Sequence, residues 1–369
     1  MPGVVTRSAC LLGFGNVGRR FCELVARKGD ELADEHGLRV VFAAVGTAAH
    51  GSLLASSGLT AAEVLAAAAS GDEPGTFPYP VRSGVELLAA SGADLLIEAT
   101  PLDPHGGRAA IAHLEAGLAH GMDVITVNKG PIAWDYRRLA ALAAAGGRRL
   151  LFEGAVMDGC PIFSLFRSCL PGCRLLGFEA VFNSTTNYIL DALGEGVGFA
   201  DALARVQAAG YAETDPSHDI DGHDAAAKTA ALANVLMDAG LTPDDVPKDS
   251  IRDLTAERVA GARAAGRRLR VVCSAAFGER PTARGDRSAA RGKRPAGHVA
   301  AAAAAPVRAA VRLTELGPEH ALFSATGSTL SALLFTDLMG TVQVAERDAL
   351  PDQTAYAIYA DLLAIHEGR

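Results

Sequence analysis

The feature that most constrains the fold is a glycine-rich turn near the N-terminus. The residues Gly13-Phe14-Gly15-Asn16-Val17-Gly18 follow an apolar run at 9–12 and precede a stretch with apolar residues at helical spacing. A strand, a glycine turn and a helix in this order are typical of dinucleotide binding. The glycines let the backbone approach a pyrophosphate, and the helix N-terminus offers unpaired N–H groups. We predict that these six residues bind a dinucleotide.

Apolar runs and helical patterns alternate through the first 150 residues. The runs have the length and β-branching of buried parallel strands. We expect strands at 40–45, 95–97, 124–127 and 150–152, and helices at 60–69, 107–120 and 135–145. Alternating strands and helices predict a parallel sheet covered on both faces. The predicted fold class is α/β, with a Rossmann-type, doubly wound sheet in residues 1–150.

The pattern after Glu153 is less regular and predicts a second, α+β domain over residues 151–339. Here we expect a strand at 178–182, helices at 186–193, 199–209 and 224–239, and order from 330 to 339. A final helix at 353–365 is expected to return to the first domain, which residues from about 340 to 369 complete.

One segment of the second domain, residues 279–310, differs from its surroundings. It is rich in Arg, Ala, Gly and Pro and has almost no large apolar residue. Such a composition buries too little apolar surface to offset the entropy of ordering the chain. We predict that it is irregular and exposed, with order returning at Val311.

Charge and cysteine usage exclude several classes of protein. Lys and Arg number 34 against 42 Asp and Glu, a net charge of −8, so affinity for nucleic acid or an anionic membrane is not expected. No apolar run reaches the roughly 18 residues of a membrane span, and we expect no secretory signal before the glycine turn. The 6 cysteines lack CxxC spacing, which indicates reduced thiols. We expect a cytoplasmic protein.

Two polar segments follow predicted strands and lie where parallel sheets bind ligands. Thr100 belongs to the segment 98–101, and Lys129 belongs to Asn128-Lys-Gly-Pro131. We predict that Thr100 and Lys129 face the cofactor, although a lysine past a strand end is often only a solvated charge.

The choice between NAD and NADP rests on weaker signals. NAD-binding folds usually carry a carboxylate at the end of the second strand, but this strand ends with Gly46-Thr47. Arg19 and Arg20 could meet a 2′-phosphate, or they are ordinary helix surface residues. We lean slightly to NADP and keep NAD open.

The densest group of ionisable residues extends from Gly210 to Lys228. A calcium loop would need a bidentate Glu where Lys228 stands, so this interpretation fails. Asp224 and Lys228 are four residues apart and share one helix face. They form either a surface ion pair or, at the mouth of an apolar helix, a proton-transferring lysine among substrate-binding carboxylates.

Several motifs together resemble those of homoserine dehydrogenases without a C-terminal ACT domain, and they occur in that family's order over most of residues 10–240. They are Gly13-Phe-Gly-Asn-Val-Gly18, Asn128-Lys-Gly-Pro131, Glu153-Gly-Ala-Val-Met-Asp-Gly-Cys-Pro161, Asn183-Ser-Thr-Thr-Asn-Tyr-Ile-Leu190 and the Gly210–Lys228 block. The block is highly specific, whereas the glycine turn is generic.

The resemblance implies NAD(P)-dependent interconversion of L-homoserine and L-aspartate 4-semialdehyde in threonine and methionine biosynthesis. It implies that Lys228 exchanges a proton with the substrate oxygen and that Lys129 lies between nicotinamide and substrate. Glu213 and Asp224 would bind the substrate, including its amino group. The family is typically a homodimer formed through its second domain.

The resemblance also implies a sodium site made of backbone carbonyls. These would belong to Glu153, Val156, Asp158 and Cys160.

The sequence departs from the family in three places. Ser184 replaces a common glycine, Arg347-Asp-Ala-Leu350 replaces a glycine-rich loop, and residues 279–310 match nothing in the family. Two alternatives stay open: a related NAD(P)-dependent amino-acid or semialdehyde oxidoreductase, and a non-catalytic cofactor-binding derivative.

Overall fold

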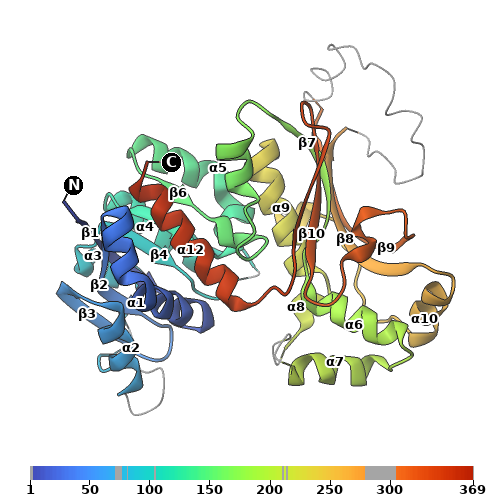
Figure 1. Ribbon diagram of the computed structural model, residues 1–369, viewed down its shortest axis with the longest axis horizontal. Coiled ribbons are helices and arrows are strands. Elements are labelled where there is room, and N and C mark those ends of the chain that lie inside the picture. The colour runs from blue at the N-terminus through green and yellow to red at the C-terminus, as the bar shows by residue number, and fades with distance from the viewer. Residues whose placement is uncertain are drawn as a thin grey trace. The chain divides into compact units, whose positions relative to one another are not determined.

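The computed structural model describes residues 3–70, 77–80, 82–103, 105–209, 212, 215–278 and 305–368. The chain forms two compact units (Figure 1). Unit 1 contains Met1–Ser164 and Leu350–Arg369, and unit 2 contains Leu165–Ala349. None of the helices in the described ranges is long and apolar enough to cross a membrane.

Unit 1 is built on a six-stranded sheet with the order β3-β2-β1-β4-β5-β6, in which only β3 runs antiparallel to its neighbour. The strands are β1 (Val5–Leu12), β2 (Leu38–Gly46), β3 (Ser52–Leu59), β4 (Leu95–Glu98), β5 (Asp123–Thr126) and β6 (Leu150–Leu151). The helices are α1 (Asn16–His36), α2 (Ala61–Ala69), α3 (Gly84–Ser91), α4 (Arg108–Ala119), α5 (Lys129–Ala145), α12 (Pro351–His366) and the 3₁₀ turn η1 (Glu153–Ala155).

Two hydrophobic clusters cover the two faces of this sheet. Leu11 of β1 packs with α1, α2 and α12, whereas Cys10 and Leu12 pack with α3, α4 and α5. The side chains of a strand alternate between faces, so β1 contributes to both clusters. A parallel sheet buried on both faces is the Rossmann-type arrangement predicted from the sequence.

Unit 2 contains a five-stranded antiparallel sheet with the order β11-β10-β7-β8-β9. The strands are β7 (Leu175–Val181), β8 (Arg268–Phe277), β9 (Val307–Leu316), β10 (Leu330–Thr336) and β11 (Thr341–Glu346). The helices are α6 (Ser184–Gly194), α7 (Phe199–Ala208), α8 (Ser217–Ile220), α9 (His223–Met237) and α10 (Ala256–Ala264), with short turns η2 (Leu165–Cys169), η3 (Pro243–Asp245) and η5 (Ala321–Ser324). Helix α9 contacts β7, β8 and β9. The predicted fold class, α/β with a second α+β domain, is confirmed.

The prediction for residues 279–310 is wrong at its C-terminal end. Strand β9 begins at Val307, and its first residue pairs with Phe277 of β8. An edge strand needs few large side chains, because backbone hydrogen bonds to its single neighbour hold it in place. The rest of the segment, 279–304, lies outside the described residues.

Helix α5 also differs from the predicted helix at 135–145, because it begins at Lys129. Asp135 has non-helical backbone angles (φ −149°, ψ 26°), so a kink divides the helix there. Pro131 lies in the first turn, where proline is tolerated. The sequence pattern identified only the part after the kink.

Candidate active site

The glycine turn of unit 1 is shaped by two close approaches of its backbone. Gly13 has φ +97°, and a Cβ atom there would lie 2.3 Å from the carbonyl oxygen of Ala99. A Cβ on Gly18 would lie 2.2 Å from the carbonyl oxygen of Gly13. No larger residue fits at either position without a backbone shift. Helix α1 can therefore begin close to both β1 and β4.

The residues between these two glycines form the open side of the turn. Gly15 caps α1 without a side-chain hydrogen bond, and a Cβ on it would meet no atom within 4 Å. Asn16 is exposed and Val17 half-buried, whereas Phe14 is buried against Phe77 with ring centroids 5.0 Å apart. The first backbone N–H groups of α1 thus adjoin open space. This suits a pyrophosphate.

The loop after β4 is held by a fully buried carboxylate. Glu98 accepts hydrogen bonds from the backbone N–H of Thr100 (3.1 Å) and from its hydroxyl. Its other oxygen accepts the hydroxyl of Thr126, at the end of β5 (2.8 Å). Strands β1 and β4 lie side by side at the point where the strand order reverses, which is where such sheets bind ligands. Thr100 is therefore fixed beside the glycine turn.

Asn128 connects this loop to the helix that carries Lys129. Its side-chain oxygen accepts the N–H of Gly130 (2.9 Å), and its side-chain nitrogen donates to the carbonyl oxygens of Thr100 (3.1 Å) and Pro101 (3.3 Å). Lys129 is the first residue of α5 and is half-buried. The backbones of Thr100 and Lys129 are thereby held at one edge of the sheet.

The two arginines considered for cofactor choice differ in their contacts. The guanidinium of Arg20 forms an ion pair with Asp352 of α12 (2.6 Å). The guanidinium of Arg19 lies 5.8 Å from the ring centroid of Phe14. The hydroxyl of Thr47, after β2, donates to the carbonyl oxygen of Gly51 (2.9 Å). Of the two arginines, Arg19 lies at the glycine turn, and Arg20 faces α12.

In unit 2, Asp224 and Lys228 of α9 form an ion pair of 3.1 Å. The Lys228 ammonium also donates a hydrogen bond to the carbonyl oxygen of Phe182 (2.8 Å), just after β7. Their side chains are only 11% and 16% exposed, so this is not a solvated surface pair. A lysine held by two acceptors in a poorly hydrated place has a fixed position suited to proton transfer.

Asn183, which follows β7, joins this pair to another carboxylate. Its side-chain nitrogen donates to Asp219 (2.6 Å) and to Asp224 (3.0 Å). Its side-chain oxygen accepts the N–H of Thr186 and caps α6 (2.8 Å). Ser184 is the first residue of that helix. Asn183 and Asp219 had no assigned role from the sequence, and only their place in the two motifs pointed to them.

The structure therefore brings together Asp224 and Lys228 in unit 2, and the glycine turn with Thr100 in unit 1. Glu213 and Gly210, the other end of the ionisable block, lie outside the described residues.

Comparison with known proteins assigns these two sites to one family. The family model "Homoserine dehydrogenase" matches residues 161–363, and the model "Homoserine dehydrogenase, NAD binding domain" matches residues 13–153. The chain belongs to the homoserine dehydrogenase family. It is 32% identical over 359 residues to the NAD(+)-dependent homoserine dehydrogenase of Pseudomonas canavaninivorans, covering 97% of this chain and 95% of the relative.

Two further relatives extend the match. The homoserine dehydrogenase of Methanocaldococcus jannaschii is 28% identical over 361 residues, covering 96% of this chain and 97% of the relative. The crystal structure of homoserine dehydrogenase from Thermoplasma acidophilum shares the fold, with a TM-score of 0.79 and 20% identity over 98% of this chain and 100% of that one. Like other members of the homoserine dehydrogenase family, this protein is an NAD(P)-dependent oxidoreductase.

Three of the six cysteines are too deeply buried to serve as the nucleophile of an acylating semialdehyde dehydrogenase. Burial raises the pKa of Cys10, Cys22 and Cys273 to about 12, so each stays a thiol at neutral pH. Cys273 lies beneath α9 and contacts the carbonyl oxygen of Ala225 (3.8 Å). A thiolate nucleophile would need the opposite shift of its pKa.

The segment with the predicted carbonyl ligands, residues 153–160, is a tight turn in unit 1. The backbone N–H of Glu153 donates to Asp361 (2.8 Å), and the Thr354 hydroxyl donates to the carboxylate of Asp158 (3.1 Å). Asp158 has φ 46°, and the carbonyl oxygen of Cys160 accepts a backbone N–H (2.8 Å). Among the described residues, no cluster of His, Cys, Asp and Glu side chains could hold a metal ion. A cation here would depend on backbone carbonyls.

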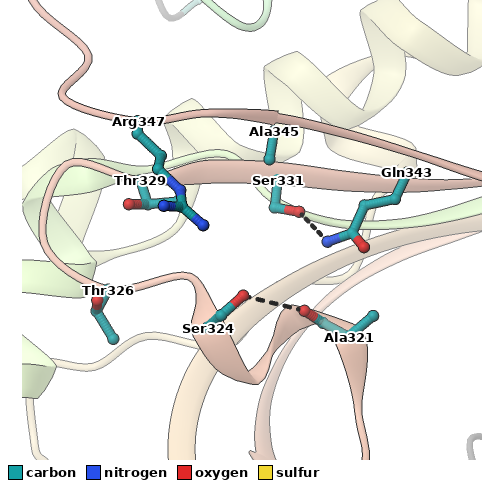
Figure 2. Close-up of a pocket in the computed structure, with 8 residues that line it drawn as sticks. All are labelled: Ala321, Ser324, Thr326, Thr329, Ser331, Gln343, Ala345 and Arg347. Atoms are coloured by element: carbon teal, nitrogen blue, oxygen red, sulfur yellow. Dashed lines mark hydrogen bonds between the residues drawn. The ribbon is translucent and has the colours of Figure 1, made fainter.

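A cavity of about 600 Å3 in unit 2 is not lined by any of the predicted site residues (Figure 2). Its lining is mostly hydroxyl and amide groups, with Gln343 donating to Ser331 (3.1 Å). Arg347 is the one ionisable side chain among the described residues that line it. Without an acid–base pair it is not the candidate active site.

Proposed function

We propose that the protein interconverts L-homoserine and L-aspartate 4-semialdehyde with NAD(P). The observation that carries this proposal is the buried Lys228–Asp224 pair of unit 2, in a chain that belongs to the homoserine dehydrogenase family. A binding module without chemistry has no need of a lysine held in this way.

We assign cofactor binding to unit 1, which corresponds to the domain predicted over residues 1–150. It is completed by α12 rather than from about residue 340, because β11 pairs in the sheet of unit 2. The six residues from Gly13 to Gly18 would hold the pyrophosphate at the N-terminus of α1, and Thr100 and Lys129 would contact the cofactor at the ends of β4 and β5. When bound, the nicotinamide supplies or accepts the hydride. The open space at Gly15 fits the approach of the pyrophosphate.

We assign substrate binding and proton transfer to unit 2, which corresponds to the domain predicted over residues 151–339. Hydride addition to the aldehyde carbon leaves charge on the oxygen, and Lys228 donates a proton to it; in the reverse direction Lys228 accepts this proton. The Lys228 ammonium is oriented by Asp224 and by the carbonyl oxygen of Phe182. Lys129, the first residue of α5, would act between the nicotinamide and the substrate.

Substrate recognition follows from the negative charge around Lys228. Asp224 and Glu213 would bind the ammonium group of the amino-acid substrate, because carboxylates form strong charge-assisted hydrogen bonds with it. Asn183 holds Asp219 and Asp224 together by donating to both. Ser184, beside Asn183, would adjust the fit of the substrate.

For the cofactor we retain a slight preference for NADP. β2 ends without a carboxylate at Gly46, and Arg19 lies at the glycine turn with an exposed side chain. A relative named NAD(+)-dependent, at 32% identity, favours the opposite choice. Comparing KM for NADPH and NADH in Arg19→Ala and in the unchanged protein decides between them.

We further propose a sodium ion at the carbonyls of Glu153, Val156, Asp158 and Cys160. The positive φ of Asp158 bends this short segment back on itself, which suits a ring of carbonyl ligands. Thermal unfolding in sodium chloride and in N-methylglucamine chloride tests it without an activity readout.

We also propose a cytoplasmic homodimer formed through the second domain. Leu338 and Met339, in the turn between β10 and β11, are 70% and 59% exposed. Large apolar side chains at such a tip are often buried in an assembly. Sedimentation equilibrium of the unchanged protein and of Leu338→Asp tests the dimer.

The activity itself is tested by adding L-aspartate 4-semialdehyde to the protein with NADPH or NADH and following absorbance at the nicotinamide wavelength. Oxidation that requires the semialdehyde and disappears in Lys228→Met supports the proposal. No oxidation with either nucleotide, from protein that binds the nucleotide, would overturn it in favour of a non-catalytic derivative.

A further inference from the structure

A second cavity of unit 2 has an unusual concentration of arginine. It has a volume of about 220 Å3 and lies between α6, α10 and the start of β8. Its charged lining consists of Arg263, Arg267, Arg268 and Arg270 with Asp191 and Glu195. Four guanidinium groups against two carboxylates leave this cavity with an excess of positive charge, in a protein whose overall charge is −8.

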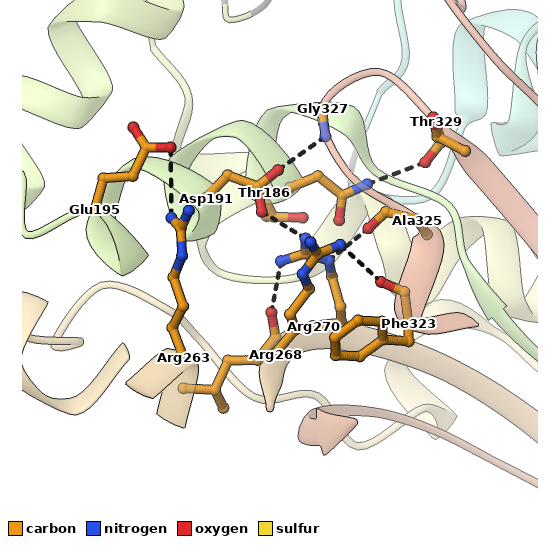
Figure 3. A network of polar contacts seen from close by, with 12 residues as sticks. Thr186, Asp191, Glu195, Arg263, Arg268, Arg270, Phe323, Ala325, Gly327 and Thr329 are labelled. Atoms are coloured by element: carbon orange, nitrogen blue, oxygen red, sulfur yellow. Dashed lines mark hydrogen bonds and ion pairs between the residues drawn. The ribbon is translucent and has the colours of Figure 1, made fainter. Parts of the chain in front are cut away.

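The deepest of these arginines is committed to the fold. Arg270 is 1% exposed and forms an ion pair with Asp191 (2.5 Å). It also donates to the carbonyl oxygens of Ala325 (2.6 Å) and Leu269 (2.8 Å), as Figure 3 shows in part. Asp191 accepts a further N–H from Gly327 (2.9 Å). This network fixes the floor of the cavity and uses the charge of Asp191.

The other three guanidinium groups have either a weak ion pair with a carboxylate or a carbonyl oxygen as their partner. Arg263 lies 3.4 Å from Glu195 and Arg267 lies 3.9 Å from Glu315, and all four side chains are about half exposed. Such long, solvated pairs contribute little energy. Arg268 donates to the carbonyl oxygen of Phe323 (3.0 Å) and covers its ring at 4.5 Å. These side chains retain capacity to bind an anion.

We propose that this cavity binds a small dianion of the phosphate class. A guanidinium presents its N–H groups in a fork that matches two phosphate oxygens, and several guanidinium groups around one cavity match a tetrahedral dianion. Pockets for drug-sized ligands occupy about 300–1,000 Å3, so a cavity of about 220 Å3 suits a phosphate group better than a whole nucleotide. The ligand is either free phosphate or the phosphate group of a small metabolite.

The experiment is calorimetric titration of inorganic phosphate into the full chain at constant ionic strength, with saturating NADP+ to occupy the dinucleotide site. We expect one phosphate per chain with Kd between about 10 μM and 1 mM. The double variant Arg263→Gln/Arg267→Gln should raise Kd at least tenfold, and Arg267→Gln alone at least threefold. Arg258→Gln, exposed on α10 like Arg263 but outside the cavity, should change Kd less than twofold.

Three results would overturn the proposal. They are no phosphate binding, unchanged binding in the double variant, and equal weakening in Arg258→Gln, which would indicate only a general effect of charge. Binding to the Lys228→Met variant should be unchanged, so the outcome does not depend on the proposed catalytic function. Titration with glycerol 3-phosphate then distinguishes a phosphomonoester from free phosphate by which binds more tightly.

Discussion

The two candidate sites of this molecule are built from different parts of the chain. In unit 1 the proposed cofactor site is defined by backbone shape, because Gly13 and Gly18 allow close approaches that a Cβ would block. In unit 2 the site is made of polar and charged side chains, with Asp224 in contact with both Lys228 and Asn183. A site defined by backbone shape should be impaired when a Cβ is added, and a site made of charged groups should be impaired when one of them is removed.

The two sites should therefore respond differently to substitution. Removal of one charged group from the unit 2 site should leave the fold in place and stop chemistry. Addition of one methyl group to the unit 1 turn should disturb folding or cofactor binding, depending on whether the added atom meets protein or open space.

The largest effect is expected for Lys228→Met, which keeps the length of the side chain and removes the proton donor. We expect kcat to fall by roughly 10²–10⁴-fold. Nucleotide affinity, measured by fluorescence titration, should stay within twofold. Lys28→Met, on the surface of unit 1, is the control and should keep full activity. A kcat above about a tenth of the unchanged value would falsify the assignment.

Two alanine substitutions in the glycine turn should separate folding from binding. In Gly18→Ala the new Cβ would lie 2.2 Å from a carbonyl oxygen, so we expect a loss of about 1–3 kcal/mol in the free energy of unfolding. In Gly15→Ala the Cβ points into open space, so stability should stay unchanged while nucleotide Kd rises at least about tenfold. Equal melting temperatures for both variants would contradict this division.

A smaller effect is expected for Asn183→Ser. Serine can still cap α6, so the helix should remain, but the donors to Asp219 and Asp224 are lost. We expect KM for homoserine to rise by about tenfold, with kcat changed less. Thr255→Ser, the same kind of exchange at the cap of α10, is the control. An unchanged KM would show that Asn183 acts only as a helix cap.

The fold of unit 1 was largely predictable, because parallel strands are continuous apolar runs and the glycine turn has a fixed spacing. Strand β3 escaped prediction, since Ser52–Leu59 is rich in serine and is held by antiparallel pairing with β2. Helix α3 is only eight residues long, and its sequence has no strong helical spacing of apolar residues. Short elements of this kind depend on tertiary pairing, which the local sequence does not contain.

The candidate sites were predictable where one short motif contains all the partners. Asp224 and Lys228 are on one helix, so their spacing alone placed them together. Asn183 is 41 residues from Asp224 in the chain, and its contact depends on β7 ending beside α9. The sequence identified its motif but not its partners. The arginine cavity is similar, since its lining is spread from Leu190 to Thr326.

The smallest effect concerns a solvated ion pair near the unit 2 site, between Arg252 and Asp221 (2.6 Å). The hydrogen bond from Arg252 holds the pKa of Asp221 below its usual value. A lowered pKa in the folded state stabilises the protein above the unfolded pKa, and this contribution is lost as pH falls through the folded pKa. Arg252→Ala should therefore lower the melting temperature at pH 7 by about 2 °C or less, because both side chains are exposed to solvent.

The difference should shrink as the pH is lowered below about 4, and also in 1 M salt. Scanning calorimetry at several pH values measures it, with Arg258→Ala as a control that has no such pair. A difference that grows on acidification would show that Asp221 is stabilised by something other than Arg252.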